Sequence, residues 1–252
     1  MESLRTNINQ ICSDFRDIKD AIVSSGVEVA DGTKTSEYAG KVSEVYEQGK
    51  KSQYDEFWDC LLSEKKAVFN YAFQHTDFSK TPRGFDPTRA IKPTDAVYTF
   101  FGARGITKLT KNQIDFSRCN VTNYCFAYCV DLIEIEEVYL PPNNTYMFAE
   151  CYKLEKIGKL IIPERVTYIS DNHPFVNDSK LTYITIEGVI PSTISFRWCS
   201  LLTHESLMSI INALKDYSGT TSTYTLTLHA DAKARLTDAE KATITQKGWT
   251  LA

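Results

Sequence analysis

The stretches NYCFAYCVDLIEIEEVYLPPNN (residues 123–144) and TYMFAECYKLEKIGKLIIPERV (residues 145–166) lie end to end, and each is 22 residues long. Both read tyrosine, any residue, Phe-Ala, any residue and Cys, and both continue with spaced apolar residues and a proline. Two adjacent segments of equal length with matching residues indicate an internal repeat.

The repeat extends beyond these two copies. Its skeleton is a phenylalanine, an apolar residue six positions later, and a second apolar residue three positions beyond that. It occurs in four copies and a truncated fifth: Phe100–Ile106–Leu109, Phe126–Leu132–Ile135, Phe148–Leu154–Ile157, Phe175–Leu181–Ile184 and Phe196–Leu202. Because so short a unit cannot bury its own apolar face, we expect neighbouring copies to stack around one continuous core.

The composition of the 252-residue chain is that of a folded protein, with 42% hydrophobic and 24% charged residues. A net charge of −4 argues against a broad nucleic-acid surface. The polar, amphipathic residues 1–15 do not have the pattern of a secretory signal, and no apolar stretch has the length expected of a transmembrane helix. Seven cysteines, an odd number, fit a reducing compartment. We therefore expect synthesis and folding in a cytoplasm.

The N-terminal residues carry a heptad pattern. Apolar side chains follow one another at steps of 4, 3, 4, 3 and 4, at Leu4, Ile8, Ile11, Phe15, Ile18 and Ile22. Such a narrow stripe suits helix–helix association, and isoleucine at both core positions favours trimers or tetramers over dimers. The pattern predicts a coiled-coil oligomerisation segment. The alternative is a helix that docks on its own chain.

Residue composition and apolar pattern divide the rest of the chain into segments. A second helix is expected from Thr35 to about Leu62, so residues 1–62 form an N-terminal helical oligomerisation or attachment segment. Prolines at 82, 87 and 93 predict an irregular lead-in over residues 63–97, and the repeats fill residues 98–202.

Residues 203–252 predict a closing α/β cap. A helix is expected after Thr203, ending near Gly219, followed by a strand at TYTLTLH (residues 223–229). A second helix should begin at the capping box Thr237-x-x-Glu240, before a last strand at WTLA (residues 249–252).

The cysteines are candidates for chemistry, but their position argues for packing. Cys129, Cys151 and Cys199 each follow a repeat phenylalanine by three residues, where the intervening copy has Asp178. A position that recurs with the repeat is a packing position, and a zinc site needs a different ligand spacing. The four histidines, His75, His173, His204 and His229, also lack metal or hydrolase spacing. We expect no metal, no cofactor and no enzymatic activity.

Aromatic residues near the repeat turns are candidates for recognition. Tyrosine combines a large contact area with a polar group, and aromatic residues are enriched among binding hot spots. The expected binding surface comprises Tyr128, Tyr152, Tyr183, Arg197 and Trp198. The alternative is that many of the tyrosines fill the core between repeats.

The segments FAYCVDLIEI, FAECYKLEKI and FVNDSKLTYI, followed by IP or LPP, resemble bacterial leucine-rich repeat proteins of the BspA-like class. The closing LTHESLMSIINALKDYSG and LTDAEKATITQKGWTLA resemble the C-terminal ending of such proteins in Firmicutes and their prophages. IKDAIVSSG and YAGKVSEVYEQGKKSQYDEFWD are similar to openings of phage and prophage structural proteins.

The resemblance implies a mixed α/β fold: a leucine-rich-repeat β-solenoid with an N-terminal coiled-coil segment and a C-terminal α/β cap. It further implies a non-catalytic binding protein, associated with a phage or prophage tail, that joins other virion proteins. Its ligand would be a host cell-surface protein or glycan. The alternative is an intracellular leucine-rich-repeat interaction scaffold.

Overall fold

The computed structural model divides the chain into two compact units, Met1–Trp58 and Asp59–Ala252. The structure describes residues 69–80, 85, 92–111, 113–169 and 173–252, all within the second unit. These residues form a mixed α/β fold built from two parallel sheets and a few helices. The predicted helical segment 1–62 lies outside the described residues.

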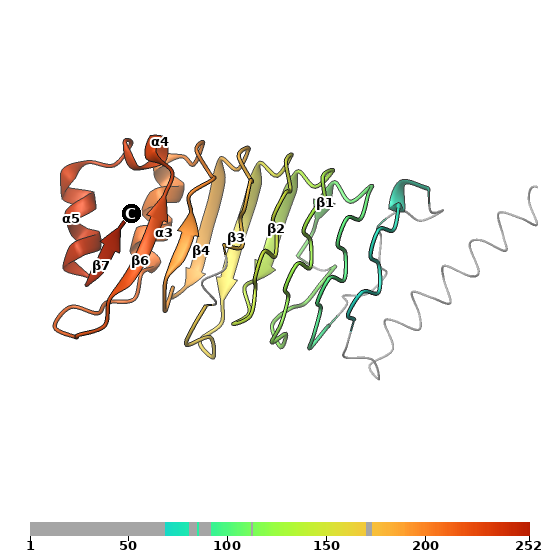
Figure 1. Cartoon of the computed structure of the whole chain (residues 1–252), viewed down its shortest axis with the longest axis horizontal. Helices are drawn as coiled ribbons and strands as arrows, with labels where there is room; N and C mark the ends of the chain where they lie inside the picture. The colour runs from blue at the N-terminus through green and yellow to red at the C-terminus, as the bar shows by residue number, and fades with distance from the viewer. Residues whose placement is uncertain (1–68, 81–84, 86–91, 112, 170–172) are drawn as a thin grey trace, which may run out of the picture. The chain divides into compact units, whose positions relative to one another are not determined.

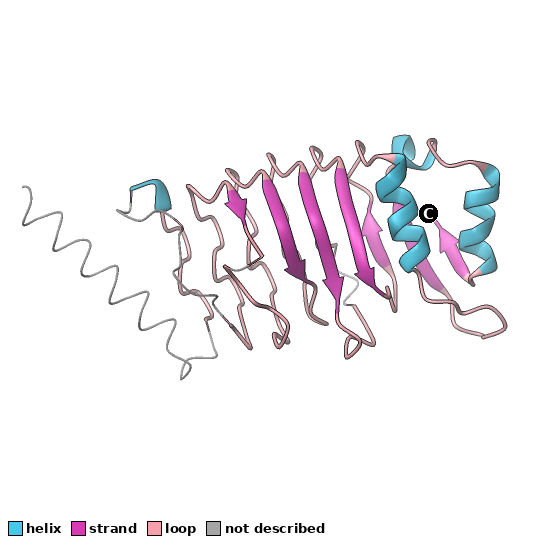
Figure 2. Cartoon of the chain, turned by 180° about the vertical axis from the view of Figure 1, so that it is seen from behind, coloured by secondary structure: helices cyan, strands magenta, loops and turns pink. Residues whose placement is uncertain are grey.

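The larger sheet contains one parallel strand from each of four successive repeats, in the order of the chain. Figures 1 and 2 show these strands side by side across the middle of the fold, joined by turns at both ends. The strands are β1 (Lys108–Leu109), β2 (Glu134–Tyr139), β3 (Lys156–Ile162) and β4 (Tyr183–Gly188).

The register of this sheet follows the sequence repeat. Leu109 pairs with Ile135, Ile135 with Ile157, and Ile157 with Ile184. Each is the apolar residue nine positions after a repeat phenylalanine, and each is buried. The expectation that equivalent residues of neighbouring copies pack together is therefore confirmed for these strands.

The repeat phenylalanines form a single buried stack. Adjacent rings lie nearly parallel, with centroids 5.1 to 5.7 Å apart, through Phe73, Phe100, Phe126, Phe148, Phe175 and Phe196. Phe73 was not expected in this series. Its segment belongs to the predicted irregular lead-in, but the structure shows a further repeat there, followed by the short 3-10 helix η2 (Phe78–Lys80). The skeleton misses this copy because Ser79 stands six positions after Phe73, where the other copies have an apolar residue.

The segments around the phenylalanines pair with their neighbours without forming strands. Every second backbone N–H donates to the next repeat, as in Tyr124 N to Thr145 O (2.8 Å), Phe126 N to Met147 O (2.8 Å) and Tyr128 N to Ala149 O (2.8 Å). The intervening N–H groups close turns within their own repeat, as in Cys125 N to Thr122 O (3.0 Å). Alternation of the two patterns pairs the buried backbone donors that a packed segment must satisfy.

The C-terminal end has the elements that the sequence predicts. The strands β5 (Ile194–Phe196), β6 (Tyr224–Leu228) and β7 (Trp249–Leu251) form a second parallel sheet. The helices are α3 (His204–Ala213), α4 (Ala230–Lys233) and α5 (Asp238–Gln246), which gather at one end of the sheets in Figure 2. Thr203 caps α3, and the capping box of Thr237 and Glu240 starts α5. Helix α3 ends at Ala213, earlier than the predicted Gly219, and α4 was not predicted.

Helix α3 occupies the place beside β4 where a further strand would lie. Two serines of the helix accept hydrogen bonds from the outer backbone of β4: Ile184 N donates to Ser206 Oγ (2.9 Å) and Ile186 N to Ser209 Oγ (2.8 Å). The hydroxyls of one helix thus replace the carbonyls of a strand.

Lys247 joins the two longer helices, and its removal should destabilise the fold. Its ammonium group donates to the carbonyls of Ile211, Asn212 and Leu214 at 2.9 to 3.0 Å, at the C-terminal end of α3 where a positive charge is favourable. We expect Lys247→Met to lower the free energy of unfolding by about 1–2 kcal/mol in urea denaturation. The control Lys241→Met removes only an exposed ion pair with Asp238 and should cost under about 0.5 kcal/mol. Equal losses in both variants would contradict this assignment.

Candidate binding surface

The repeat cysteines lie inside the stack. Cys129 Sγ donates to the carbonyl of Phe100 (3.1 Å), and Cys151 Sγ donates to that of Phe126 (3.2 Å), in each case one repeat earlier. Both side chains and Cys199 are fully buried, and burial raises the pKa of each thiol above its ordinary value. The prediction that these positions serve packing is confirmed.

Asp178 takes the cysteine position in the Phe175 repeat and is buried with the thiols. Its Oδ1 accepts the backbone N–H of Cys151 at 3.0 Å, and its Oδ2 has no hydrogen-bond partner among the described residues. Burial, with a smaller contribution from the nearby Glu150 carboxylate, raises the pKa of Asp178 well above its ordinary value. The carboxyl group therefore favours its neutral form, and ionisation of Asp178 destabilises the folded state.

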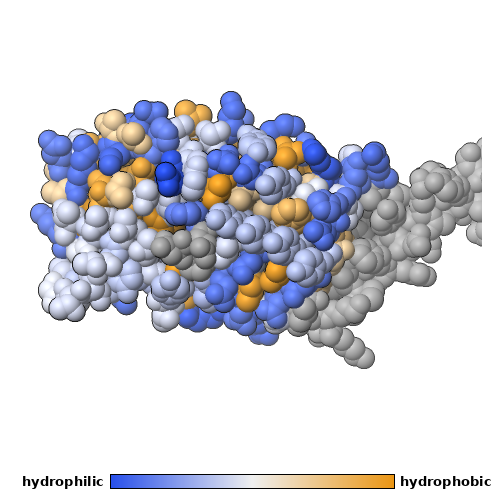
Figure 3. Space-filling view, in the orientation of Figure 1, coloured by the Kyte–Doolittle hydropathy of each residue, from blue (hydrophilic) through white to orange (hydrophobic). Residues whose placement is uncertain are grey.

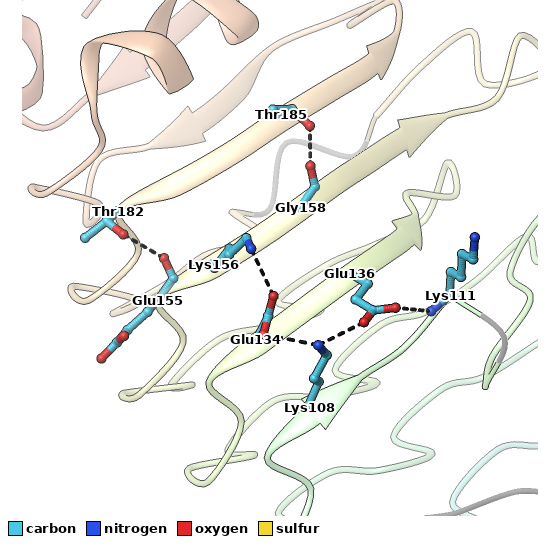
Figure 4. A network of polar contacts seen from close by, with 9 residues as sticks. All are labelled: Lys108, Lys111, Glu134, Glu136, Glu155, Lys156, Gly158, Thr182 and Thr185. Carbon is cyan, nitrogen blue, oxygen red and sulfur yellow. Dashed lines mark hydrogen bonds and ion pairs between the residues drawn. The ribbon is translucent and has the colours of Figure 1, made fainter.

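The outward side of the larger sheet is occupied by paired charges. Lys108 contacts Glu134 (3.4 Å) and Glu136 (2.8 Å), while Lys156 contacts Glu134 (3.0 Å); Figure 4 shows this network. Farther along the strands, Lys159 contacts Glu187 (2.8 Å). We call this surface the sheet face. A ligand that binds here has to displace existing ion pairs, which makes the sheet face the poorer candidate for recognition.

A row of tyrosines runs along the phenylalanine segments instead. Tyr71, Tyr98, Tyr124 and Tyr146 each precede a repeat phenylalanine by two residues. Their rings follow one another with centroids 5.3, 4.7 and 5.1 Å apart. We call these four residues the tyrosine ladder. Desolvation and the neighbouring phenols raise the pKa of Tyr124, so its hydroxyl stays protonated at neutral pH.

Further aromatic rings extend this row sideways. Phe101 lies against Tyr98 (5.2 Å between centroids) and against Tyr128 (5.2 Å), and the rings of His75 and Phe101 are nearly perpendicular (5.4 Å between centroids). Tyr71 and Tyr128 are 57% and 45% exposed, whereas Tyr98, Phe101, Tyr124 and Tyr146 are half-buried. The tyrosine ladder together with His75, Phe101 and Tyr128 is called the ladder face below.

The backbone of the ladder face is unusual for these side chains. The residues two before and two after most of the repeat phenylalanines have φ between 48° and 66°, among them Tyr124 and Tyr128. Each of these two stands third in a hydrogen-bonded turn, a place normally taken by glycine. A left-handed L-residue costs roughly 1–2 kcal/mol. The hydrogen bonds to the next repeat and the ring contacts offset this cost and hold the tyrosines in one orientation.

The positions around the ladder are almost free of charge. In the four repeats of Phe73, Phe100, Phe126 and Phe148, the residues three before, two before and two after the phenylalanine occupy twelve positions. They include one carboxylate, Glu150, and no lysine or arginine. Glu150 is engaged by Asn177 Nδ2 (2.7 Å) and by the hydroxyl of Tyr152. On the face shown in Figure 3, apolar residues form small separate patches among polar ones.

The five predicted binding residues fall on different surfaces. Tyr128 belongs to the ladder face, and Tyr152, 50% exposed, contacts Glu150 beside it. Arg197 lies over the ring of Trp198 at 4.8 Å, and Trp198 meets His173 at 5.3 Å in the later repeats. Tyr183 lies on β4, where its hydroxyl donates to Glu205 (3.3 Å). It is separated from the ladder face and joins the polar surroundings of the sheet face.

Sequence reasoning missed Tyr71, Tyr98, His75 and Phe101 as candidates. The available signal was the tripeptide tyrosine-x-phenylalanine, which occurs as YAF, YTF, YCF and YMF at residues 71–73, 98–100, 124–126 and 146–148. The predicted oligomerisation residues, from Leu4 to Ile22, lie outside the described residues.

The chain matches no protein-family model, no curated protein and no solved structure. In the described ranges, no group of three or more His, Cys, Asp or Glu side chains is placed to hold a metal ion. None of the helices in that part of the chain is long and apolar enough to cross a membrane.

The buried Asp178 predicts a pH-dependent stability. Because its pKa is raised in the folded state, its contribution to stability is greatest below its unfolded pKa of about 3.9 and declines as the pH rises toward the folded value. Asp178→Asn keeps an acceptor for Cys151 N–H but cannot ionise. We expect it to raise the free energy of unfolding by about 1–3 kcal/mol at pH 7, with the gain shrinking at pH 4. Urea denaturation at both pH values measures this, and an equal difference at both would refute it.

Proposed function

We propose that this chain is a non-catalytic binding protein of a phage or prophage tail, which recognises a host cell-surface protein or glycan through the ladder face. The single observation that carries the proposal is the contrast between its two surfaces. Charges on the sheet face are already paired, whereas the ladder face offers exposed aromatic rings in fixed orientations. Rigid aromatic groups bind with a small loss of conformational entropy.

For the finer fold, we propose a leucine-rich-repeat β-solenoid of the BspA-like class with a C-terminal α/β cap. One parallel strand per repeat, pairing at the same repeat position, supports this assignment. So does the stack of equivalent phenylalanines, since repeat architectures bury a continuous core between neighbouring units.

The assembly part of the proposal rests on the sequence alone. The heptad of isoleucines would join several copies, as a trimer or other homo-oligomer, and the N-terminal segment would attach them to other virion proteins. Several copies would present several ladder faces to one cell, which strengthens attachment without any new contact.

Binding to intact cells tests the recognition part. We expect the labelled full-length chain to bind cells of at least one Firmicutes strain, measured by flow cytometry. The variant Tyr128→Ala should bind at least about tenfold more weakly, because it removes an exposed ring of the ladder face. The matched control Tyr183→Ala, on the sheet face, should bind as the unchanged chain does. Binding to no strain would favour the intracellular scaffold, and loss with Tyr183→Ala alone would move the site to the sheet face.

A charge in the heptad seam tests assembly. We expect Ile11→Asp to reduce the solution mass, measured by light scattering, from an oligomer to a single chain, because the seam cannot bury a carboxylate. Gln10→Asp adds the same charge outside the seam and should leave the mass unchanged. A single-chain mass for the unchanged protein would mean that the heptad docks on its own chain.

A further inference from the structure

We infer that the ligand of the ladder face is an uncharged polysaccharide whose chain runs along the tyrosine ladder. This inference rests on the proposed recognition function and adds the chemical class of the ligand. Four consecutive repeats present the same residue at steps of 4.7 to 5.3 Å between ring centroids. A ligand that is itself a repeating polymer can make the same contact at successive steps, so that weak contacts add up.

The stacking decides which parts of the tyrosines a ligand can reach. Within the tyrosine ladder, Tyr98 is stacked between Tyr71 and Tyr124, and the second face of Tyr124 meets the tilted ring of Tyr146. Both Tyr98 and Tyr124 are half-buried. What remains for a ligand is a row of ring edges and hydroxyl groups. A phenolic hydroxyl both donates and accepts a hydrogen bond, which is also what each sugar hydroxyl does.

Amide groups beside the ladder add hydrogen-bonding capacity. Asn70 Oδ1 accepts from Val97 N (2.7 Å), and Asn123 Oδ1 accepts from Thr145 N (3.0 Å). These bonds fix the two side chains against the next repeat and leave the NH₂ groups as donors. The surface thus combines hydroxyls, amides and ring edges, which suits a ligand with alternating hydroxyl and C–H surface.

The charges distinguish between classes of polymer. An anionic polymer, such as a nucleic acid or a phosphate-containing wall polymer, needs lysine or arginine to replace its counterions. The twelve positions around the ladder hold none, and their one carboxylate, Glu150, is engaged by Asn177 and Tyr152. Arginine, a common anchor of protein-binding hot spots, is missing from these positions as well, although tyrosine, another such anchor, is present. An uncharged polysaccharide fits without unpaired charges on either side.

The test uses a Firmicutes strain to which the full-length chain binds, and cell walls from it that have been boiled in detergent and digested with protease. We expect the labelled chain to bind these walls with unchanged affinity, and to lose binding once periodate has oxidised the sugar diols. Binding should change less than about twofold between about 0.1 M and 1 M NaCl, because no charged pairs form.

The outcomes separate the inference from the proposed function. Binding to intact cells that disappears after protease treatment would keep the recognition function and overturn the polysaccharide in favour of a protein. Binding to walls that weakens steeply with salt would replace the uncharged polymer with an anionic one. Failure to bind any intact cell would overturn the recognition function itself.

Removal of the hydroxyls alone tests the role of the ladder. The variant carrying Tyr98→Phe, Tyr124→Phe and Tyr146→Phe keeps the stacked rings, and we expect it to bind walls about a hundredfold more weakly, roughly fivefold for each hydroxyl. The control with Tyr139→Phe and Tyr183→Phe, two tyrosines of strands β2 and β4, should bind as the unchanged chain does. Circular dichroism and the thermal midpoint check that both remain folded. Unchanged wall binding of the folded triple variant would overturn the assignment to the tyrosine ladder.

Discussion

The stacking of one phenylalanine per repeat in a common register governs the rest of this fold. Once Phe126 lies on Phe100 and Phe148 lies on Phe126, the residue nine positions later must fall opposite its equivalent, and the parallel strands form there. For the same reason, the thiols of Cys129 and Cys151, three positions after their own repeat phenylalanine, reach the carbonyl of the phenylalanine one repeat earlier. The tyrosine ladder is a further consequence, since the tyrosines are only two residues from the stack.

The sequence predicts most of this fold because its apolar spacing repeats. The skeleton identified the strand register, and local capping signals at Thr203 and Thr237 located the two longer helices. The skeleton missed the repeat at Phe73 because Ser79 and Pro82 stand at the two positions where the other copies have apolar ladder residues. That repeat is held by its stacked ring and by backbone bonds to the next one, such as Phe73 N to Thr99 O (2.8 Å), which leave no mark in residue type.

The candidate site was less predictable than the fold. Tyrosine enrichment near the turns indicated recognition, yet Tyr128 and Tyr183 belong to different surfaces. Their separation depends on where the chain turns between the phenylalanine segment and the strand. The left-handed residues beside the repeat phenylalanines are tyrosine, histidine, glutamate and asparagine, and only one of them, Gly102, is glycine. Tertiary hydrogen bonds, rather than residue preference, impose that conformation.

The position of helix α3 beside β4 limits where a further repeat can be added to the larger sheet. A strand edge can accept another strand, including one from a second molecule, whenever its backbone groups are left unpaired. Ser206 and Ser209 occupy those groups on β4. A duplicated repeat can therefore be accommodated between existing repeats, where one strand replaces another, but not after β4 without displacing the helix. Helix α3 therefore ends the larger sheet at β4, and the hydroxyls of Ser206 and Ser209 protect the edge of β4 against pairing with a strand of another molecule.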